Sequence, residues 1–396
     1  MDLSATGAGR APTTAAGGFT ERRDSSSRPG IAGHLILANG GERMSLARGC
    51  TATFVQRGTR LHARNLMKLP EALLPARRHS SVANYALIAA GASIALGAMA
   101  LLAHEQKKVA ERRHPPEGKF LDVDGVRLHY LERGAGEPLI LLHGNGTQIE
   151  DFETSGLLDL AAKSHRVIAI DRPGFGHSSR PRGTIWTPAA QSDLIHEAMI
   201  QLEVEQATVL GHSLGASIAV ALALRHPASV KKLVLVSGYF YPSDRFDAAL
   251  QFIGALPVVG DIMRYTISPL LARLAWGGVM KKIFAPAEVS KSFSAAIKEM
   301  ALRPSQLHAS AADSALMIPN AAATQKSYGD LGMPVSIVVG GNDRLIKASS
   351  QSMRLHREIV GSELRVVPRR GHMVHHEAAP EIMRAIGPAL STMGAE

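Results

Sequence analysis

The sequence predicts an α/β fold in which a mostly parallel sheet is covered by helices on both faces. Short, continuous apolar runs recur through the C-terminal two thirds of the chain, as expected for strands that are buried on both sides. Stretches with helical spacing separate most of these runs, and this alternation is typical of parallel strands joined by crossover helices. One long interval without strand character predicts an inserted helical subdomain.

The first expected element of the folded body is a hairpin. The segment "KFLDVDGVRLHYLERG" begins at residue 119 and alternates apolar and polar positions on either side of Asp124-Gly125. Asp-Gly between two such runs is a strong signal for a tight hairpin turn. The buried strands expected after it cover residues 138–144, 166–174, 207–213, 231–238, 335–341 and 364–368. Helices are expected over residues 187–203, 214–226, 348–359 and 377–391.

The inserted subdomain is expected over residues 239–328. Segments such as "PLLARLAWGGVMKKIF" carry apolar residues at spacings of three and four, which indicates helices. A helical lid over one edge of the sheet is the simplest interpretation. The α/β core would then consist of residues 119–238 and 329–396.

Residues 1–84 read as a disordered, basic extension. Residues 1–113 hold 16 Lys and Arg against 7 Asp and Glu, whereas the remainder holds 28 against 27. The basic excess therefore lies outside the folded body, and this argues against a nucleic-acid-binding face. The single cysteine, Cys50, excludes an internal disulfide and a multi-cysteine metal site.

Residues 85–103 form a charge-free apolar stretch, "YALIAAGASIALGAMALLA". Its length suits one helical crossing of a bilayer, so we expect a single-pass anchor, with residues 104–118 as a linker. A cleaved export signal is an alternative, because "AMA" at 98–100 resembles a cleavage site. A third interpretation of this stretch is a buried helix of a soluble protein. Flanking basic residues slightly favour a cytoplasmic body, and the reverse topology stays open.

A candidate nucleophile lies where one expected strand meets a helix. "VLGHSLGAS" contains Gly-His-Ser-Leu-Gly at 211–215, the G-x-S-x-G pattern of a nucleophile elbow. The chain must turn within one residue there, so we expect a strained backbone at Ser213. Any residue larger than glycine at position 211 or 215 would collide with its surroundings, which explains Gly211 and Gly215. The turn would present the Ser213 hydroxyl in a cleft at the carboxyl edge of the sheet.

A serine hydroxyl needs a base, and the base needs an orienting carboxylate. Asp343 follows the expected strand in "VSIVVGGNDRLI", and His372 follows the last one in "LRVVPRRGHMVHHE". The chain order Ser213, Asp343, His372 is that of the α/β-hydrolases. Other histidines and aspartates could in principle serve as the base or the acid, but their positions along the chain fit these roles less well. These residues are His143, His212, His375, His376, Asp313 and Asp330.

Residues 119–392 resemble lidded serine hydrolases of the α/β-hydrolase fold superfamily. The segments "LLHGNG", "DRPGFGHSSRP", "GHSLGAS", "GGNDRLI" and "GHMVHHE" match that family's segments in order. The resemblance implies a nucleophile at Ser213, a general acid–base at His372 and an orienting carboxylate at Asp343. It also implies an oxyanion hole formed by the backbone N–H groups of Asn145 and Leu214.

The lid is expected to set specificity. Its aromatic residues Tyr239, Phe252 and Trp276 are candidate substrate contacts and equally candidates for the lid's own core. We expect hydrolysis of a lipophilic carboxylic ester or lipid, with no cofactor and no metal. The open alternatives are a cofactor-free haloperoxidase or perhydrolase, and a non-catalytic binding protein that retains the fold. Serine at position 213 disfavours dehalogenase and epoxide hydrolase chemistry, which needs a carboxylate there.

Overall fold

The structure is a computed structural model that describes residues 80–243 and 253–387. All described residues belong to one compact unit, Arg77–Glu396. The expected disorder of residues 1–79 and the end of the last expected helix, beyond residue 387, lie outside the described residues.

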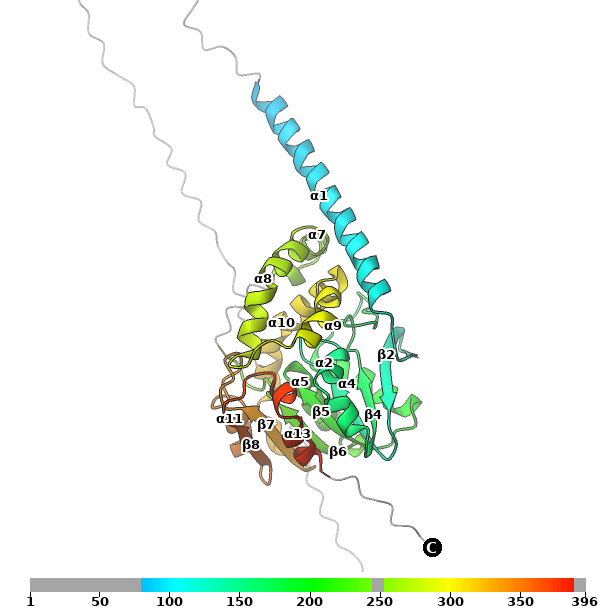
Figure 1. Ribbon diagram of the computed structural model, residues 1–396, viewed down its shortest axis with the longest axis vertical. Coiled ribbons are helices and arrows are strands. Elements are labelled where there is room, and N and C mark those ends of the chain that lie inside the picture. The colour runs from blue at the N-terminus through cyan, green and yellow to red at the C-terminus, as the bar shows by residue number, and fades with distance from the viewer. Residues whose placement is uncertain (1–79, 244–252, 388–396) are drawn as a thin grey trace, which may run out of the picture. The chain divides into compact units, whose positions relative to one another are not determined.

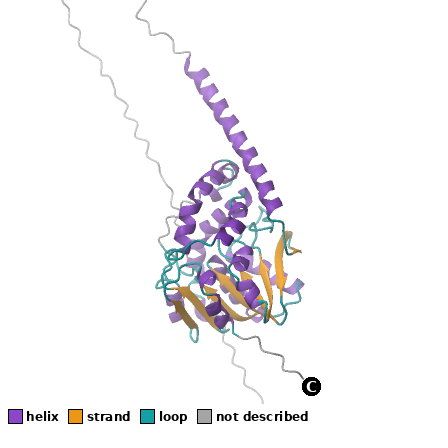
Figure 2. Ribbon diagram, viewed as in Figure 1, coloured by secondary structure: helices purple, strands orange, loops and turns teal. Residues whose placement is uncertain are grey.

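A single eight-stranded sheet forms the centre of the described body (Figure 2). Its strand order is β1-β2-β4-β3-β5-β6-β7-β8, with β2 antiparallel to both of its neighbours and all other pairs parallel. The mostly parallel sheet that the sequence predicts is thereby confirmed. The strands are β1 (Lys119–Val123), β2 (Val126–Arg133), β3 (Glu137–Leu142), β4 (His165–Ile170), β5 (Ala207–His212), β6 (Val230–Val236), β7 (Val335–Gly340) and β8 (Glu363–Val367).

The hairpin between β1 and β2 turns at Asp124-Gly125, as its sequence predicts. Both residues have positive φ, 49° for Asp124 and 78° for Gly125. Two consecutive positive φ angles are what a two-residue hairpin loop requires, and they explain why this dipeptide stands there.

Helices cover both faces of the sheet (Figure 1). Neighbouring strand residues alternate between two apolar layers, so Val209 packs with one layer and Leu210 with the other. The first layer includes Ile195, Ile218 and Leu355 from three helices, α4 (Pro188–Gln201), α5 (Leu214–Arg225) and α11 (Ser352–Glu358). The second layer is covered by α2 (Glu150–Thr154), α3 (Leu157–Ala161), α12 (Val374–Glu377) and α13 (Ala379–Ile386).

The lid lies between β6 and β7, where the sequence predicts the insertion. Residues 244–252 of this interval are outside the described part. Two short turns of 3-10 helix flank the core strands, η2 (Pro227–Ser229) and η3 (Tyr328–Asp330). The described lid helices are α7 (Val259–Tyr265), α8 (Ile267–Phe284), α9 (Lys291–Ala301) and α10 (Pro304–Thr324).

The apolar stretch forms one long helix, α1 (Ser80–Arg113), which extends well beyond the stretch itself. Among the described residues it is the one helix long and apolar enough to cross a membrane. The sequence predicts a linker over residues 104–118, but residues 104–113 belong to α1. Residues 80–84, expected to be disordered, are also part of this helix. The helix continues because residues 104–113 contain no helix breaker and carry i,i+3 and i,i+4 pairs from Glu105 to Lys108 and from Lys107 to Glu111.

Candidate active site

Ser213 occupies a sharp turn between β5 and α5. Its backbone has φ 54° and ψ −116°, a region that non-glycine residues rarely adopt. The Ser213 amide donates to the carbonyl of Val236 on the neighbouring strand β6, at 2.9 Å, which holds this turn in place. Such strain persists only where the surrounding structure enforces it, and it clusters at functional sites.

The two flanking glycines allow the turn to close. A Cβ added at Gly211 would lie 2.3 Å from the carbonyl oxygen of Gly215. One added at Gly215 would lie 2.1 Å from the carbonyl oxygen of Leu142 on β3. Neither distance is possible for a real side chain, so helix α5 can start this close to the sheet only with glycine at both positions.

His372 and Asp343 are joined by a buried hydrogen bond. Asp343 follows β7, His372 follows β8, and Nδ1 of the histidine lies 2.8 Å from Oδ2 of the aspartate. The second carboxylate oxygen accepts from the backbone amides of Leu345 and Ile346, both at 2.8 Å. The carboxylate is therefore fixed from both sides, and the imidazole turns its Nε2 away from it.

The loop that carries His372 lies against the elbow. The His372 carbonyl is 3.2 Å from Nε2 of His212, the residue before Ser213, and the two rings are 5.0 Å apart between centroids. Within the described part of the chain, Ser213 Oγ makes no hydrogen bond to His372. In enzymes without substrate such contacts are often long, and they tighten when the substrate binds.

The Gly144-Asn145 peptide lies beside the nucleophile. A Cβ at Gly144 would stand 3.2 Å from the Cβ of Ser213. The Gly144 carbonyl accepts from Nη2 of Arg172 at 3.0 Å and is 2.8 Å from Nδ1 of His143. Because a trans peptide directs its N–H opposite to its C=O, the Asn145 N–H points away from Arg172. This N–H is one of the two oxyanion-hole donors that the family resemblance implies.

The side chain of Asn145 ties this segment to the lid. Its Nδ2 donates to the Ser310 carbonyl at 3.1 Å and to Ser314 Oγ at 2.8 Å, both on α10. Its Oδ1 is buried and has no hydrogen-bond partner among the described residues. The candidate oxyanion segment is therefore held from the core by Arg172 and from the lid by α10.

Apolar side chains surround the position after the nucleophile. Leu214 packs in a cluster with Tyr239, Met317, Ala321 and Ile346, drawn from the lid and from the loop after Asp343. Of the three lid aromatics proposed from the sequence, only Tyr239 belongs to this cluster. Phe252 lies outside the described residues.

Trp276 packs in a different part of the lid. It contacts the cluster built around Phe284, Phe293 and Ile297 in α8 and α9. In the described structure it therefore belongs to the lid's own core, the reading that the sequence left open beside substrate contact.

A buried cluster that no sequence motif indicates lies beside the loop that carries His372. Asp151 of α2 lies 3.1 Å from Nε2 of His375 and 2.7 Å from Nε2 of His376, and His212 lies nearby. Burial alone would raise the pKa of Asp151, but attraction to and hydrogen bonds from His375 and His376 outweigh burial and hold that pKa well below its usual value. These contacts fix the helix that follows His372. The pairing joins residues more than 220 positions apart, so no local pattern shows it.

Three residues of this cluster form a group that could hold a metal ion. Asp151, His212 and His375 each offer one ligand atom, and these atoms lie within 4.8 Å of one another. Burial, with repulsion from neighbouring histidines, lowers the pKa of His212, and burial outweighs attraction to Asp151 in lowering that of His375. One Asp151 oxygen is bonded to His375 and His376, whereas its other oxygen and Nδ1 of His212 are buried and have no hydrogen-bond partner among the described residues.

Buried polar contacts connect the loop after β4 to the lid. Arg172 donates to Asp313 of α10 at 2.7 Å and to the His143 carbonyl at 3.0 Å. Asp171, in the loop after β4, accepts from the Ile149 amide in the loop after β3, at 2.9 Å. Burial, with repulsion from Arg172, lowers the pKa of His143 to about 4, so this histidine is a neutral structural residue. Asp330 stands in η3, before β7.

Comparison with known proteins places the chain in a family. A model described as the alpha/beta hydrolase fold matches residues 137–379, more than half of the chain. The chain therefore belongs to the α/β-hydrolase fold family, as its sequence segments indicate. It is a hydrolase with a mostly parallel sheet and flanking helices.

Its curated relatives include two named hydrolases from Pseudomonas. 2-hydroxymuconate semialdehyde hydrolase of Pseudomonas sp. strain CF600 is 38% identical over 136 residues, which are 34% of this chain and 48% of that protein. 2-hydroxy-6-oxo-2,4-heptadienoate hydrolase of Pseudomonas putida is 27% identical over 286 residues, 69% of this chain and 96% of that protein. The match thus spans about half of the first relative and nearly all of the second.

Solved structures show the same fold at lower identity. An α/β-hydrolase fold protein from Burkholderia ambifaria has a TM-score of 0.59 and 21% identity, covering 68% of this chain and 96% of that one. A bacterial membrane phospholipase A has a TM-score of 0.54 and 20% identity, covering 77% of this chain and 96% of that one. Both likenesses concern the fold.

Proposed function

We propose that the protein hydrolyses lipophilic carboxylic esters through an acyl-enzyme on Ser213. In this proposal His372 takes the hydroxyl proton while Ser213 Oγ attacks the ester carbonyl carbon. The alcohol then leaves with that proton and an acyl-serine remains. Water attacks this acyl group and gives a proton to His372. His372 then returns that proton to Ser213 Oγ as the bond between Oγ and the acyl carbon breaks, which releases the acid and restores the serine.

Asp343 and two backbone amides complete the proposed machinery. The 2.8 Å contact to Asp343 holds the imidazole with its Nδ1 protonated, so that Nε2 is free to act as the base. The oxyanion would be held by the N–H groups of Asn145 and Leu214. Loss of one such donor costs about 2.7–4 kcal/mol of transition-state stabilisation in a well-studied serine protease.

The apolar cluster beside the nucleophile carries the choice of substrate. Leu214, the residue after Ser213, packs with Met317 and Ile346, and this apolar environment beside the nucleophile would suit an apolar acyl chain. We further infer that α1 anchors the protein in a membrane, because its apolar half is long enough to span a bilayer and is largely exposed. A site held at a membrane would meet lipids or lipophilic esters.

Hydrolysis of a carbon–carbon bond is the second candidate. Similarity to the two Pseudomonas hydrolases supports it, since the name of one describes a dienoate substrate. A dienoate carries a carboxylate, which calls for a cation in the site. The buried guanidinium beside the oxyanion segment, Arg172, already donates to Asp313, Gln191 and two carbonyls. This engagement favours the ester.

A substrate panel tests the proposal. Nitrophenyl esters of increasing acyl length and a 2-hydroxy-6-oxo-dienoate would be offered to the full chain and to Ser213→Ala. We expect kcat/KM to rise with acyl length, to exceed that for the dienoate, and to vanish in Ser213→Ala. Faster cleavage of the dienoate would replace ester hydrolysis with carbon–carbon cleavage. Turnover that survives in Ser213→Ala would refute both.

A further inference from the structure

The lid exposes a large apolar surface on α7, α8 and the turn before them. Six aliphatic side chains on it are between 42% and 75% exposed. Contiguous exposed apolar surface of this kind marks an interaction site more often than it marks ordinary solvent contact. We call this surface the lid apolar face, and it consists of Val258, Ile262, Ile267, Leu270, Leu271 and Leu274.

The exposed residues of α8 follow helical periodicity. Ile267, Leu270, Leu271 and Leu274 are spaced by three, one and three residues, so they share one face of the helix. The opposite face of α8 is covered, because Phe284 is buried against α9 and Trp276 packs beside it. The exposed stripe is therefore a second apolar face for which the described residues provide no cover.

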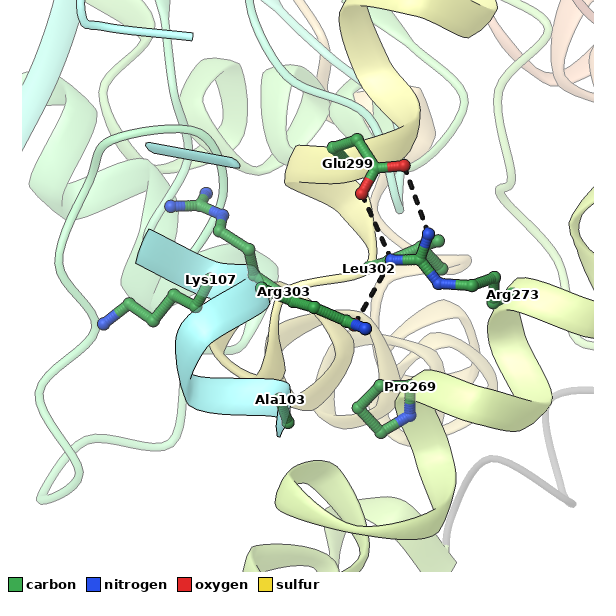
Figure 3. Close-up of a pocket in the computed structure, with 8 residues that line it drawn as sticks. Ala103, Lys107, Pro269, Arg273, Glu299, Leu302 and Arg303 are labelled. Carbon is green, nitrogen blue, oxygen red and sulfur yellow. Dashed lines mark hydrogen bonds and ion pairs between the residues drawn. The ribbon is translucent and has the colours of Figure 1, made fainter. Parts of the chain in front are cut away.

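Helix α1 meets the lid at the end of its apolar half. Ala103, Gln106 and Lys107 of α1 share a small recess with Pro269 and Arg273 of α8. Figure 3 shows Ala103 and Lys107 beside this recess, where Arg273 pairs with Glu299 of α9. The uncharged stretch of α1 ends at Ala103. Helix α8, which carries most of the lid apolar face, therefore contacts α1 where its residues change from uncharged to charged.

An ion pair between a buried arginine and a partly exposed glutamate joins α1 to the lid. Arg303, which precedes α10, donates to Glu111 of α1 at 2.8 Å, and its side chain is only 4% exposed. A guanidinium of this burial holds its partner in one geometry. The membrane helix and the lid are therefore joined, and α1 projects from the body beside α7 (Figure 1).

Basic side chains accompany the apolar surface. Lys281 and Lys282 are exposed on the last turns of α8, and Lys108 is exposed on α1 just past its apolar half. An apolar helical face flanked by lysines is typical of helices that lie in the plane of a membrane surface, where lysines meet anionic headgroups. A second copy of this chain would set these lysines against like charge.

We propose that the lid apolar face lies in the interfacial layer of the same bilayer that α1 spans. The lid is then a second membrane contact, placed by its joint with α1. The inference deepens the proposed function and depends on its membrane anchor. It gives a lipid substrate a path to the lid that does not cross bulk water.

Site-specific fluorescence in vesicles tests the contact. The full chain, with Cys50→Ser, would carry one environment-sensitive label at Leu274→Cys, Ile94→Cys or Val360→Cys. Ile94 lies in the apolar half of α1, and Val360 is a fully exposed control in the turn before β8. Vesicles would contain phosphatidylcholine and phosphatidylglycerol, with or without brominated acyl chains that quench a label at contact distance.

We expect brominated lipid to quench the labels at 274 and 94 and to leave the label at 360 unchanged. Quenching at 94 without quenching at 274 overturns the lid contact while the anchor stands. Absence of quenching at both overturns the contact and the anchor together. A label at 274 that emits at short wavelength but is not quenched by brominated lipid indicates protein cover, such as a second copy, and overturns the inference.

Discussion

At the scale of single residues, the site depends on backbone geometry that only particular side chains permit. Ser213 adopts φ 54° because Gly211 and Gly215 let strand, turn and helix approach within normal van der Waals limits. The motif was visible in the sequence for this reason, since an elbow needs the absence of side chains at fixed spacing. Its partners His372 and Asp343 were found from their positions after strands.

A methyl group at position 211 tests this geometry. In Gly211→Ala the new Cβ would start 2.3 Å from the Gly215 carbonyl oxygen, and the turn must shift. We expect a loss of about 1–3 kcal/mol in the free energy of unfolding, as for other overpacked sites, together with reduced turnover. Urea denaturation measures the change in the free energy of unfolding. Gly183→Ala is the matched control, because a Cβ there meets nothing within 4 Å; equal losses in both would contradict the account.

A buried carboxyl group makes stability depend on pH. Burial raises the pKa of Glu150 to about 8, and repulsion from Asp171 adds to the shift. Between pH 4.5 and 8 the unfolded chain loses this proton while the folded chain keeps it. The stability contributed by the group is therefore full below pH 4.5 and is lost as pH rises to 8, at about 1.4 kcal/mol per pKa unit.

Glu150→Gln should remove this dependence. We expect the variant to gain stability relative to the native chain as pH rises from 5 to 8, by an amount on the order of a few kcal/mol. Thermal or urea unfolding of both proteins at a series of pH values measures the difference. A difference that stays constant across this range would show that Glu150 ionises normally in the folded state.

At the scale of elements, α10 is the part that joins the lid to the core. Asp313 on this helix is fully buried between Arg172 and Arg180, at 2.7 and 2.9 Å. Asn145 reaches the same helix from the oxyanion segment. Movement of α10 would therefore disturb the loop after β4 and the segment beside Ser213 together.

Removing the Asp313 charge should be costly. Asp313→Asn leaves two guanidinium groups without their carboxylate, and breaking a buried pair in this way costs about 3–5 kcal/mol. Asp193→Asn is the control, because its pair with Arg225 is exposed and such pairs contribute about 0–1 kcal/mol. Chemical denaturation of both variants measures the two losses. Similar small losses would mean that Asp313 does not hold α10.

Elements with a local signal were predictable, and contacts between distant elements were not. The buried strands and the Asp-Gly hairpin were expected near their observed positions because burial and turn geometry leave their mark on neighbouring residues. The Asp151 cluster was missed because its members come from α2, β5 and α12, which only the fold brings together. Helix α1 was ended too early, since its apolar half was read apart from the charged turns that continue it.

At the scale of the whole molecule, a long apolar helix is joined to an α/β-hydrolase body. We have proposed that this helix anchors the protein in a membrane. Lysine at Ile88 and Ile94, both in its exposed apolar half, should weaken insertion, because each charge near a bilayer centre costs about 2.5–3.5 kcal/mol. We expect the native chain to stay in the membrane fraction after alkaline carbonate, and the double variant to be released in larger part. Lysine at Val360 should change nothing.

Release of the native chain by carbonate would contradict the anchor. A mature protein that lacks residues 85–103 would support export with cleavage instead. Intact mass measurement of the membrane-associated protein separates these outcomes from the anchored form.

The central claim is that Ser213 acts as a nucleophile activated by His372. The most direct measurement is mass spectrometry of the full chain after reaction with a fluorophosphonate, which modifies activated serines covalently. We predict one adduct, on the peptide that contains Ser213. It should be absent in Ser213→Ala, and its formation should be strongly slowed in His372→Ala. An unmodified Ser213 in folded protein, or equal labelling in His372→Ala, would contradict it.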